Sequence, residues 1–499
     1  MQILLKDNQY KPQSGRIFPK DSWDENYRHL LNEISGKSLQ ELRKKDNFLI
    51  FPSNEAKADL DKNDNFIYRL SGKENGLSFQ TTNIMGFLGF GENLQMQITS
   101  RFDQTNDVDQ PSKNFFLHYM LQKVCNVAFA PQTNSTENEF FEFLYYLFPN
   151  YLRKACAQGI FRAYVTHEYN DANVRGPVDV SRHIRYNIPF NGKVAYHTRE
   201  FTTDNKVTQL IRHTIEYIRD LSIGSSVLES DSATRDDVNA IVAATTTYSR
   251  NARMQIIAQN LHPVTHPYYT AYENLRKLCI AILQHKKLSY GDVDKPITGI
   301  LFDGAALWEE YLAKVFEEHD EEHKLGLIHS NNRTGGNGIS LLKDGRKNHY
   351  PDFYCKNPEA IVLDAKYKKM CTKKDDDDVD KDDSELDEKN NSEDDNYRIY
   401  LLGRDVMQML AYMHALEAKN AILISPYKFE LDKDILEENL IDETKKTAGY
   451  DGVISVIAVP IPNCESWENF VEKMKNIENM LLEKLKNIKY ALRLYLSRS

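Results

Sequence analysis

Two short segments in the C-terminal third of the chain carry residue types that hydrolyse phosphodiester bonds. Residues 350–354 read Tyr-Pro-Asp-Phe-Tyr, and residues 361–367 read Ile-Val-Leu-Asp-Ala-Lys-Tyr. Aromatic residues in the first segment and β-branched, apolar residues in the second predict two adjacent strands joined by a short turn. Because side chains alternate along a strand, Asp364 and Lys366 would emerge on one face, where Asp352 of the neighbouring strand can join them.

Two carboxylates and one ammonium at the same point would suit metal-assisted hydrolysis. Hard carboxylate oxygens bind Mg²⁺, which activates a water and neutralises charge on a phosphate, and a nearby lysine orients or deprotonates that water. The same pattern also arises by chance and then describes a strand end with ordinary surface charges. The sequence holds a single Pro-Asp pair, followed after a hairpin-length turn by a β-branched run, and this context favours the hydrolytic interpretation.

Two segments on either side are expected to be helices with further polar side chains. Helical spacing over 302–318 places Trp308, Tyr311, Leu312, Val315 and Phe316 on one apolar arc. Glu309 lies at the edge of that arc and could reach a buried metal. Over 404–417, Gln408 and Tyr412 are one turn apart and can approach a phosphate or a catalytic carboxylate. Taken singly, these residues also fit ordinary amphipathic helices.

The patterning divides the chain into three expected domains. Residues 1–130 alternate short apolar stretches with Gly and Asn, most clearly over 94–98, which predicts a β-rich N-terminal domain. Residues 131–295 show helical spacing, interrupted near 175–179 and 193–201, and predict a mostly helical middle domain. Residues 296–499 alternate helix and strand candidates, which indicates a mixed sheet flanked by helices. The expected fold class is therefore multi-domain α/β.

The 499-residue chain has an ordinary globular composition, with 41% hydrophobic and 27% charged residues. Its formal charge of −10 is concentrated in residues 375–395, which carry −11 and leave about +1 for the rest. We expect the insertion 372–397, which contains this acidic run, to be disordered and solvated. The net charge therefore does not argue against a nucleic-acid partner.

The sequence favours a cytoplasmic protein. The longest apolar run, residues 452–461, is far shorter than the roughly 20 residues that span a bilayer, and the N-terminus shows no signal-peptide pattern. The six cysteines are scattered singly, as expected for cytosolic thiols.

Other motifs carry little weight. His262 and His266 have metal-like spacing, but the prolines beside them oppose the helix that such a chelate needs. The glycine-rich stretches 86–91 and 335–338 lack the Lys and Ser/Thr of a phosphate-binding loop. A basic group could touch a DNA backbone, although a solvated face explains it as well; it comprises Arg175, Arg182, His183 and Arg185.

Taken in order, Trp308-Glu309-Glu310-Tyr311, Pro351-Asp352, Asp364-Ala365-Lys366-Tyr367-Lys368 and Gln408-Met409-Leu410-Ala411-Tyr412 resemble the nuclease domain of McrC-family proteins, a branch of the PD-(D/E)XK nucleases. Residues 98–103, 115–121, 175–179 and 200–205 are similar to stretches of that family's N-terminal and middle regions. The resemblance thus covers most of the chain.

The resemblance implies a metal-dependent endodeoxyribonuclease subunit of a McrBC-like, modification-dependent (type IV) restriction system. Its partner would be a McrB-like AAA+ GTPase. The chain would stimulate GTP hydrolysis by this partner, and its N-terminal region, residues 1–130, would insert into the partner's ring. Its substrate would be DNA, with the methylated base recognised by the partner. Asp352, Asp364 and Glu309 would bind Mg²⁺, Lys366 would position the attacking water, and Gln408 and Tyr412 would support the site.

Two alternative functions stay open from the sequence. A stand-alone PD-(D/E)XK nuclease of repair or recombination would need no ring partner, but it would also not need about 290 residues before the nuclease domain. A non-catalytic adaptor would only stimulate a GTPase, and the presence of Asp352, Asp364 and Lys366 together argues against that reading.

Overall fold

The computed structural model describes most of the chain, in two compact units. The described residues are 2–9, 25–43, 45, 48–52, 66–73, 76–91, 94–103, 114–127, 136–284, 297–323, 325–330, 338–342, 348–356, 360–373, 397–399, 401–428, 440–449 and 451–496. The first unit comprises residues 1–124, 130–140 and 286–499, and the second comprises 125–129 and 141–285. Most of the acidic insertion predicted at 372–397 lies outside the described residues.

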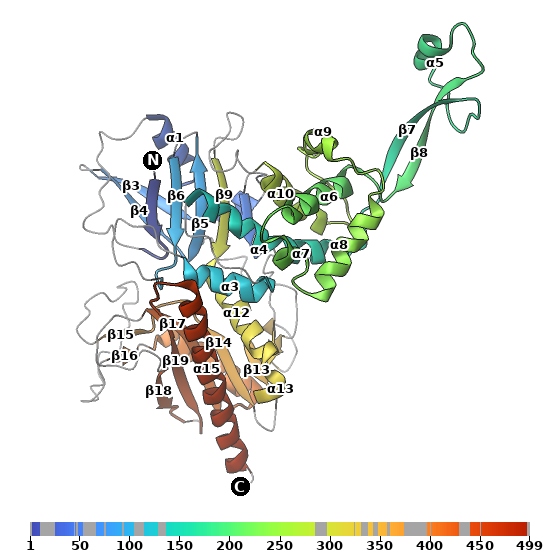
Figure 1. Ribbon diagram of the computed structural model, residues 1–499. Coiled ribbons are helices and arrows are strands. Elements are labelled where there is room, and N and C mark those ends of the chain that lie inside the picture. Colours follow the sequence, from blue (N-terminus) through green and yellow to red (C-terminus); the bar gives the residue numbers. More distant parts are fainter. Residues whose placement is uncertain are drawn as a thin grey trace. The chain divides into compact units, whose positions relative to one another are not determined.

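The first unit contains a five-stranded sheet built mainly from the N-terminal region (Figure 1). Its order is β1 (Gln2–Lys6), β6 (Leu94–Thr99), β5 (Ile84–Phe90), β9 (Ile297–Asp303) and β2 (Phe48–Phe51). β1 runs parallel to β6 and β2 parallel to β9, whereas β5 is antiparallel to both its neighbours. A Cβ atom on Gly86 would lie 2.0 Å from the Ile300 carbonyl oxygen, so only glycine allows β5 and β9 to approach so closely.

Smaller elements accompany this sheet. β3 (Tyr68–Lys73) and β4 (Gly76–Thr81) form an antiparallel hairpin. The core contains apolar side chains of the strands and of α1 (Glu25–Ile34) and α2 (Leu39–Arg43), including Leu31, Ile34, Leu88 and Met96. The β-rich character predicted for the N-terminal region is confirmed. The strand at 297–303, where a helix was expected from residue 302, joins the N-terminal sheet through hydrogen bonds to β5 and β2.

A six-stranded mixed sheet forms the other half of the first unit. Its order is β10 (Ile328–His329), β13 (Phe353–Cys355), β14 (Ile361–Ala365), β17 (Asn420–Lys428), β19 (Val453–Ile461) and β18 (Ile441–Lys446). The three strands β14, β17 and β19 are parallel, and the others pair antiparallel at the edges. These central strands are buried, apolar and β-branched, as parallel strands covered on both faces are.

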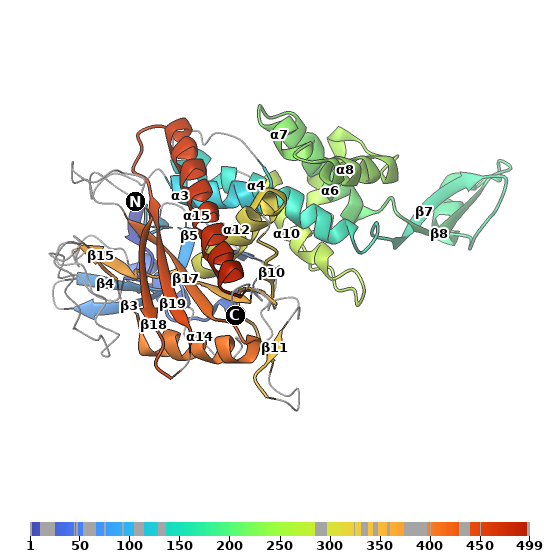
Figure 2. The ribbon, with the colours of Figure 1, turned by 90° about the horizontal axis from the view of Figure 1, so that it is seen from below.

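Helices cover both faces of this sheet. Figure 2 shows α14 (Gly403–Leu416) on one face, and α12 (Gly304–Glu318) and α15 (Trp467–Leu496) on the other. Met409 and Met413 of α14 pack against Val362, Leu423 and Val456. This arrangement confirms the expected fold class, a mixed α/β sheet flanked by helices.

Short elements complete the first unit. They are α3 (Phe115–Cys125), α13 (Asp320–His323), the pair β11 (Ile339–Ser340) and β12 (Asn348–His349), and the pair β15 (Cys371–Lys373) and β16 (Tyr397–Ile399). The last pair brings together the two ends of the predicted acidic insertion.

The second unit is mostly helical, as the spacing predicts. Its helices are α4 (Thr136–Cys156), which begins in the first unit, α5 (Val180–Asn187), α6 (Lys206–Arg219), α7 (Gly224–Leu228), α8 (Ser232–Ala244), a 3-10 turn (Arg250–Ala252), α9 (Arg253–Gln259) and α10 (Ala271–Leu283). Buried residues of α6, such as Leu210, Ile211 and Ile215, form part of its core.

An arm projects from the helices of the second unit (Figure 1). It consists of β7 (Ala163–Asp171), β8 (Val194–Thr202) and the intervening α5, and the two strands pair antiparallel over their whole length. The sequence showed only interruptions of the helical pattern here. The side chains of β7 are half-buried on one face and exposed on the other, so neither face packs on a core. Its sequence therefore lacks the alternation of apolar and polar residues by which a half-buried strand is predicted.

Two general expectations can be checked against the described residues. No described helix is both long enough and apolar enough to cross a bilayer. The six cysteines all lie in described segments, and none of them forms a disulfide there.

Candidate active site

The register of β13 and β14 places two aspartates across from each other. Phe353 pairs with Leu363 in the antiparallel ladder, so continuing the register by one residue sets Asp352 opposite Asp364. Both belong to the face of the sheet that α14 covers, together with Tyr354 and Val362. The strands predicted from the two motifs are present and adjacent, and they bring the two carboxylates together as expected.

Asp364 is buried, at 3% exposure, and Asp352 is half-buried. Asp352 Oδ2 accepts a 2.6 Å hydrogen bond from the backbone amide of Ala365. Burial and the neighbouring carboxylates Asp364 and Glu309 raise the pKa of Asp352 well above its ordinary value. Burial also raises the pKa of Asp364, although the Lys366 ammonium opposes that shift. Two like charges in a buried site repel each other.

Lys366 is the cation of the site. Its ammonium contacts Asp364 Oδ2 and donates a 3.1 Å hydrogen bond to Gln408 Oε1. Burial works against the charged form, but attraction to Asp364 and Asp405 outweighs it and raises the pKa of Lys366. Its backbone amide donates a 2.8 Å hydrogen bond to the Ile424 carbonyl of β17. The side chain and the backbone of Lys366 are therefore both fixed.

Helix α14 supplies the polar wall beside the lysine. Gln408 Nε2 donates a 3.1 Å hydrogen bond to the Tyr412 hydroxyl, one turn further along. Asp405, one turn before Gln408, pairs with Lys368 and lies 3.9 Å from the Lys366 ammonium. Gln408 and Tyr412 thus lie in the site, in a chain of hydrogen bonds that ends on Lys366.

Helix α12 brings Glu309 to the same end of the sheet. The indole of Trp308 donates a 3.2 Å hydrogen bond to the Ile424 carbonyl, the acceptor that also binds the Lys366 amide. Glu309 lies close enough to raise the pKa values of Asp352 and Asp364. Its Oε1 is 2.9 Å from Nε2 of His329.

All six predicted site residues therefore gather at one end of the six-stranded sheet. They are Glu309, Asp352, Asp364, Lys366, Gln408 and Tyr412. Among the described residues, no three His, Cys, Asp or Glu side chains form a ready-made metal cage. The assignment of Glu309, Asp352 and Asp364 as metal ligands stays a prediction.

Two further site residues were not singled out in the sequence. Asp405 was detectable in principle, because it precedes Gln408 by three residues and so shares its helical face. His329 had no local signal: it comes from the short edge strand β10, and its ring stacks on Phe353 with centroids 5.0 Å apart. Only the pairing of β10 with β13 brings it to Glu309.

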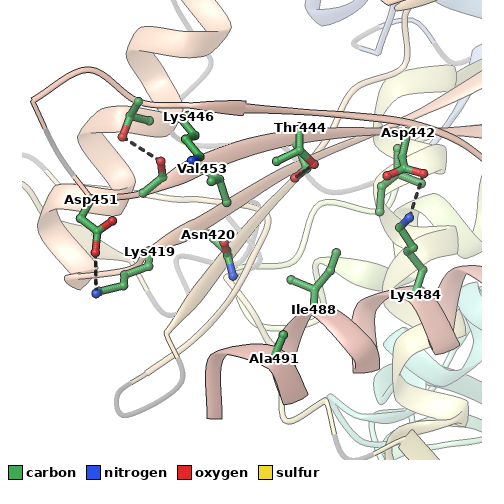
Figure 3. A pocket seen from close by; sticks show the side chains of 14 residues that line it. Lys419, Asn420, Asp442, Thr444, Lys446, Asp451, Val453, Lys484, Ile488 and Ala491 are labelled. Carbon is green, nitrogen blue, oxygen red and sulfur yellow. Dashed lines mark hydrogen bonds and ion pairs between the residues drawn. The ribbon is translucent and has the colours of Figure 1, made fainter. Parts of the chain in front are cut away.

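A separate cavity begins at the opposite ends of the same strands. It has a volume of about 530 Å³ and is bounded by β17, β18, β19 and α15 (Figure 3). Lys419 pairs with Asp451 at 2.9 Å, and Lys484 pairs with Asp442 at 2.8 Å, across its rim. None of the six site residues lines it, so this cavity is not the candidate active site.

The fold and the site define a multi-domain α/β protein with a partly buried Asp-Asp-Lys cluster at one end of a mixed sheet. The family model of the McrBC 5-methylcytosine restriction system component matches residues 79–426, well over half of the chain. The chain belongs to this family, which confirms the resemblance seen in the sequence.

Two solved structures are similar to this chain at low identity. One is a half-complex from a tetradecameric assembly of Thermococcus gammatolerans McrB AAA+ hexamers with bound McrC: the TM-score is 0.46 at 13% identity, over 96% of this chain and 99% of that one. The other is the Thermococcus gammatolerans McrBC complex, with a TM-score of 0.30 at 14% identity, over 64% of this chain and 88% of that one. No curated protein matches the sequence.

Proposed function

We propose that this chain is the DNA-cleaving subunit of a McrBC-like, modification-dependent restriction system. In this proposal it is a PD-(D/E)XK-type, Mg²⁺-dependent endodeoxyribonuclease, activated by a McrB-like AAA+ GTPase whose hydrolysis it stimulates. The observation that carries the nuclease part is the cluster of Asp352 and Asp364 on paired strands with the Lys366 ammonium against Asp364. The partner and the methylated DNA substrate follow from the family alone.

The donor set of the site fits a hard divalent cation. Its acidic groups offer carboxylate oxygens. The pKa values of Asp352 and Asp364 are both raised, first by desolvation and then by neighbouring carboxylates, which are Asp364 and Glu309 for Asp352 and Asp405 and Glu309 for Asp364. A cation between them would offset both effects, as expected for an oxygen-liganded Mg²⁺ site. Asp352, Asp364 and Glu309 would hold it. When bound, Mg²⁺ supplies charge neutralisation at a phosphate and lowers the pKa of a bound water.

The chain's own residues would orient the reactants. The Lys366 ammonium, fixed by Asp364 and Gln408, would donate a hydrogen bond to the attacking water or to a phosphate oxygen. Gln408 would hold that ammonium in place, and Tyr412 would in turn hold the Gln408 amide. Fixed donors of this kind contribute to catalysis because they need no reorganisation during the reaction.

The test is cleavage of methylated and unmethylated plasmid with Mg²⁺, by the protein alone and with a McrB-like GTPase and GTP. Asp364→Asn should abolish cutting, while Asp451→Asn is the matched control, since Asp451 is exposed and lies at the other end of the sheet. Cutting that depends on partner and GTP and is lost in Asp364→Asn supports the proposal.

Each other outcome points to a different function. Cutting by the protein alone would indicate a stand-alone nuclease. GTPase stimulation without any cutting would indicate a non-catalytic adaptor. Cutting that survives Asp364→Asn would mean that the catalytic site lies elsewhere.

A further inference from the structure

The segment that follows the catalytic strand is held by a residue of the N-terminal sheet. Arg101 lies two residues beyond the end of β6, and its side chain is 13% exposed. It donates a 2.6 Å hydrogen bond from Nη2 to the Tyr367 carbonyl and a 3.1 Å hydrogen bond from Nη1 to Asn83 Oδ1. Tyr367 directly follows Lys366. One planar guanidinium thus connects two elements more than 260 residues apart in sequence.

Arg101 is itself fixed by a buried carboxylate at the end of β1. Its backbone amide donates a 2.6 Å hydrogen bond to Asp7 Oδ1, and its guanidinium lies 3.6 Å from Asp7 Oδ2. The Asp7 side chain is fully buried. A buried carboxylate needs a charged partner to offset the loss of water, and Arg101 supplies it. The pair therefore holds the guanidinium in one place.

The Tyr367 side chain is enclosed by the same region. Its hydroxyl shares a 2.8 Å hydrogen bond with Ser100 Oγ, and its ring meets the Phe102 ring edge-on, with centroids 5.1 Å apart. A Cβ atom on Gly304 would lie 2.7 Å from the Tyr367 ring. Gly304 begins α12, the helix that carries Glu309. The residue after Lys366 is therefore packed against the start of another site-bearing element.

These contacts bear on Lys366 because a lysine side chain is long and flexible. Asp364 and Gln408 hold its ammonium, and a fixed backbone further limits the positions that the four-carbon stem can reach. The Ile424 carbonyl holds the amide of Lys366, and Arg101 holds the carbonyl of the next residue. We propose that Arg101 is a positioning residue of the catalytic centre, which fixes the backbone from which the Lys366 ammonium reaches Asp364. The catalytic consequence rests on the proposed nuclease function.

The first test measures the position of Lys366 without using cleavage. The full-length protein is treated with an amine-acetylating N-hydroxysuccinimide ester, and the labelling rate of each lysine is followed by peptide mass spectrometry. In Arg101→Gln and in the charge-balanced double variant Asp7→Asn/Arg101→Gln, we expect Lys366 to be labelled several-fold faster than in the wild type. Lys419 and Lys484, at the far end of the sheet, should be unchanged.

A matched control is Arg43→Gln. Arg43 also donates to a backbone carbonyl, that of Pro52 at 3.1 Å, but this bond joins the end of α2 to the residue after β2. It should leave the labelling of Lys366 at the wild-type rate. Arg101→Lys keeps the charge without the fork of donors, and should restore part of the protection.

The second test is the cleavage rate with partner and GTP. We expect Arg101→Gln to lower kcat by roughly 10- to 100-fold with little change in KM, because misplacing a catalytic group by about 1 Å costs rate rather than substrate binding. GTPase stimulation should stay close to that of Arg43→Gln. The thermal unfolding midpoint of Arg101→Gln should fall, because Asp7 loses its charged partner, and the double variant Asp7→Asn/Arg101→Gln should recover part of that loss.

The outcomes separate this inference from the proposed function. Lys366 labelling that is unchanged in folded Arg101 variants overturns the positioning role, and so does a uniform rise over all lysines, which would show general loosening. If the Arg101 variants do not fold, Tyr367→Phe decides by the same Lys366 measurement; it removes the hydroxyl that bonds Ser100, Met85 Sδ and Asp7 and leaves the backbone carbonyl in place. A wild-type protein that never cuts DNA refutes the nuclease, while the labelling still decides the positioning of Lys366.

Discussion

Asp352 accepts its 2.6 Å hydrogen bond from the amide of Ala365, the residue between Asp364 and Lys366. This bond joins the side chain of the Pro351-Asp352 motif to the backbone of the Asp364-Ala365-Lys366 motif, so the two carboxylates keep their relative position. It cannot cancel the repulsion between them, because a neutral amide stabilises one carboxylate without compensating the charge of the other. The repulsion therefore destabilises the metal-free protein, although the Lys366 ammonium offsets part of it.

Asp352→Asn should stabilise the metal-free protein while abolishing cleavage. The carboxamide can still accept the Ala365 hydrogen bond and can donate to Asp364, and it removes one of two repelling charges. We expect a gain of about 1–2 kcal/mol in the free energy of unfolding at pH 7.5, measured by urea denaturation in EDTA.

The pH dependence and the effect of metal check the cause of that gain. The pKa of Asp352 is higher in the folded protein than in the unfolded chain. The wild type should therefore lose stability as the pH rises above about 4, where Asp352 ionises in the unfolded chain, and this loss should end once the pH passes the pKa of folded Asp352. The variant should lose less. Adding Mg²⁺ should stabilise the wild type but not Asp352→Asn. Equal stabilisation of both proteins by Mg²⁺ would contradict the metal assignment.

Substitutions along the Lys366–Gln408–Tyr412 chain should follow a graded order. Lys366→Met removes the ammonium and should lower the cleavage rate by roughly 100-fold or more, as expected for a lost electrostatic donor. Gln408→Leu removes the acceptor that holds the ammonium, and Tyr412→Phe removes only the group that holds Gln408, so their losses should be successively smaller. Single-turnover rates of the three variants give the order. A Tyr412→Phe defect as large as that of Lys366→Met would mean that Tyr412 acts directly on the substrate.

Local patterns were enough to predict the two strands that carry the candidate site. Asp352, Asp364 and Lys366 follow from side-chain alternation on two neighbouring strands, and the register then places the aspartates opposite each other. Gln408 and Tyr412 follow from helical spacing, and the structure links them by a hydrogen bond. Such features depend on residues within one or two elements.

Contacts between distant segments could not be predicted in the same way. Nothing in the local sequence indicates that Arg101 binds the Tyr367 carbonyl, or that His329 reaches Glu309. The strand β9 was also missed, because its Thr-Gly-Ile-Leu-Phe-Asp sequence runs directly into an amphipathic helix. Its membership of the N-terminal sheet depends on pairing with β5, more than 200 residues earlier.

The arm formed by β7, α5 and β8 is a second candidate for the partner surface, beside residues 1–130. Ile184 and Phe190 are 55% and 70% exposed there, and clustered exposed apolar side chains often mark protein interfaces. Ile184→Ser with Phe190→Ser should weaken stimulation of the partner GTPase by roughly tenfold or more, without lowering the unfolding midpoint. Met254→Ser is the control, because Met254 is 75% exposed in the same unit but outside the arm. Unchanged stimulation in the arm variant would favour residues 1–130 as the contact surface.

His213 should make the second unit sensitive to mild acid. It is buried in α6 against the Tyr248 ring, with centroids 4.7 Å apart, and neither ring nitrogen has a hydrogen-bond partner among the described residues. Burial, with Arg253 and Arg212 nearby, lowers the pKa of His213 from 6.5 to about 4. His213 is therefore protonated near pH 6.5 in the unfolded chain but only near pH 4 in the folded unit. The free energy of unfolding is highest above pH 6.5 and falls as the pH drops toward 4, by up to ~3 kcal/mol.

His213→Phe should make the free energy of unfolding, measured by urea denaturation at pH 7.5 and pH 5, less dependent on pH. His262→Gln, at an exposed histidine, should leave the pH dependence unchanged. An equally steep loss in His213→Phe would assign the acid sensitivity to other groups.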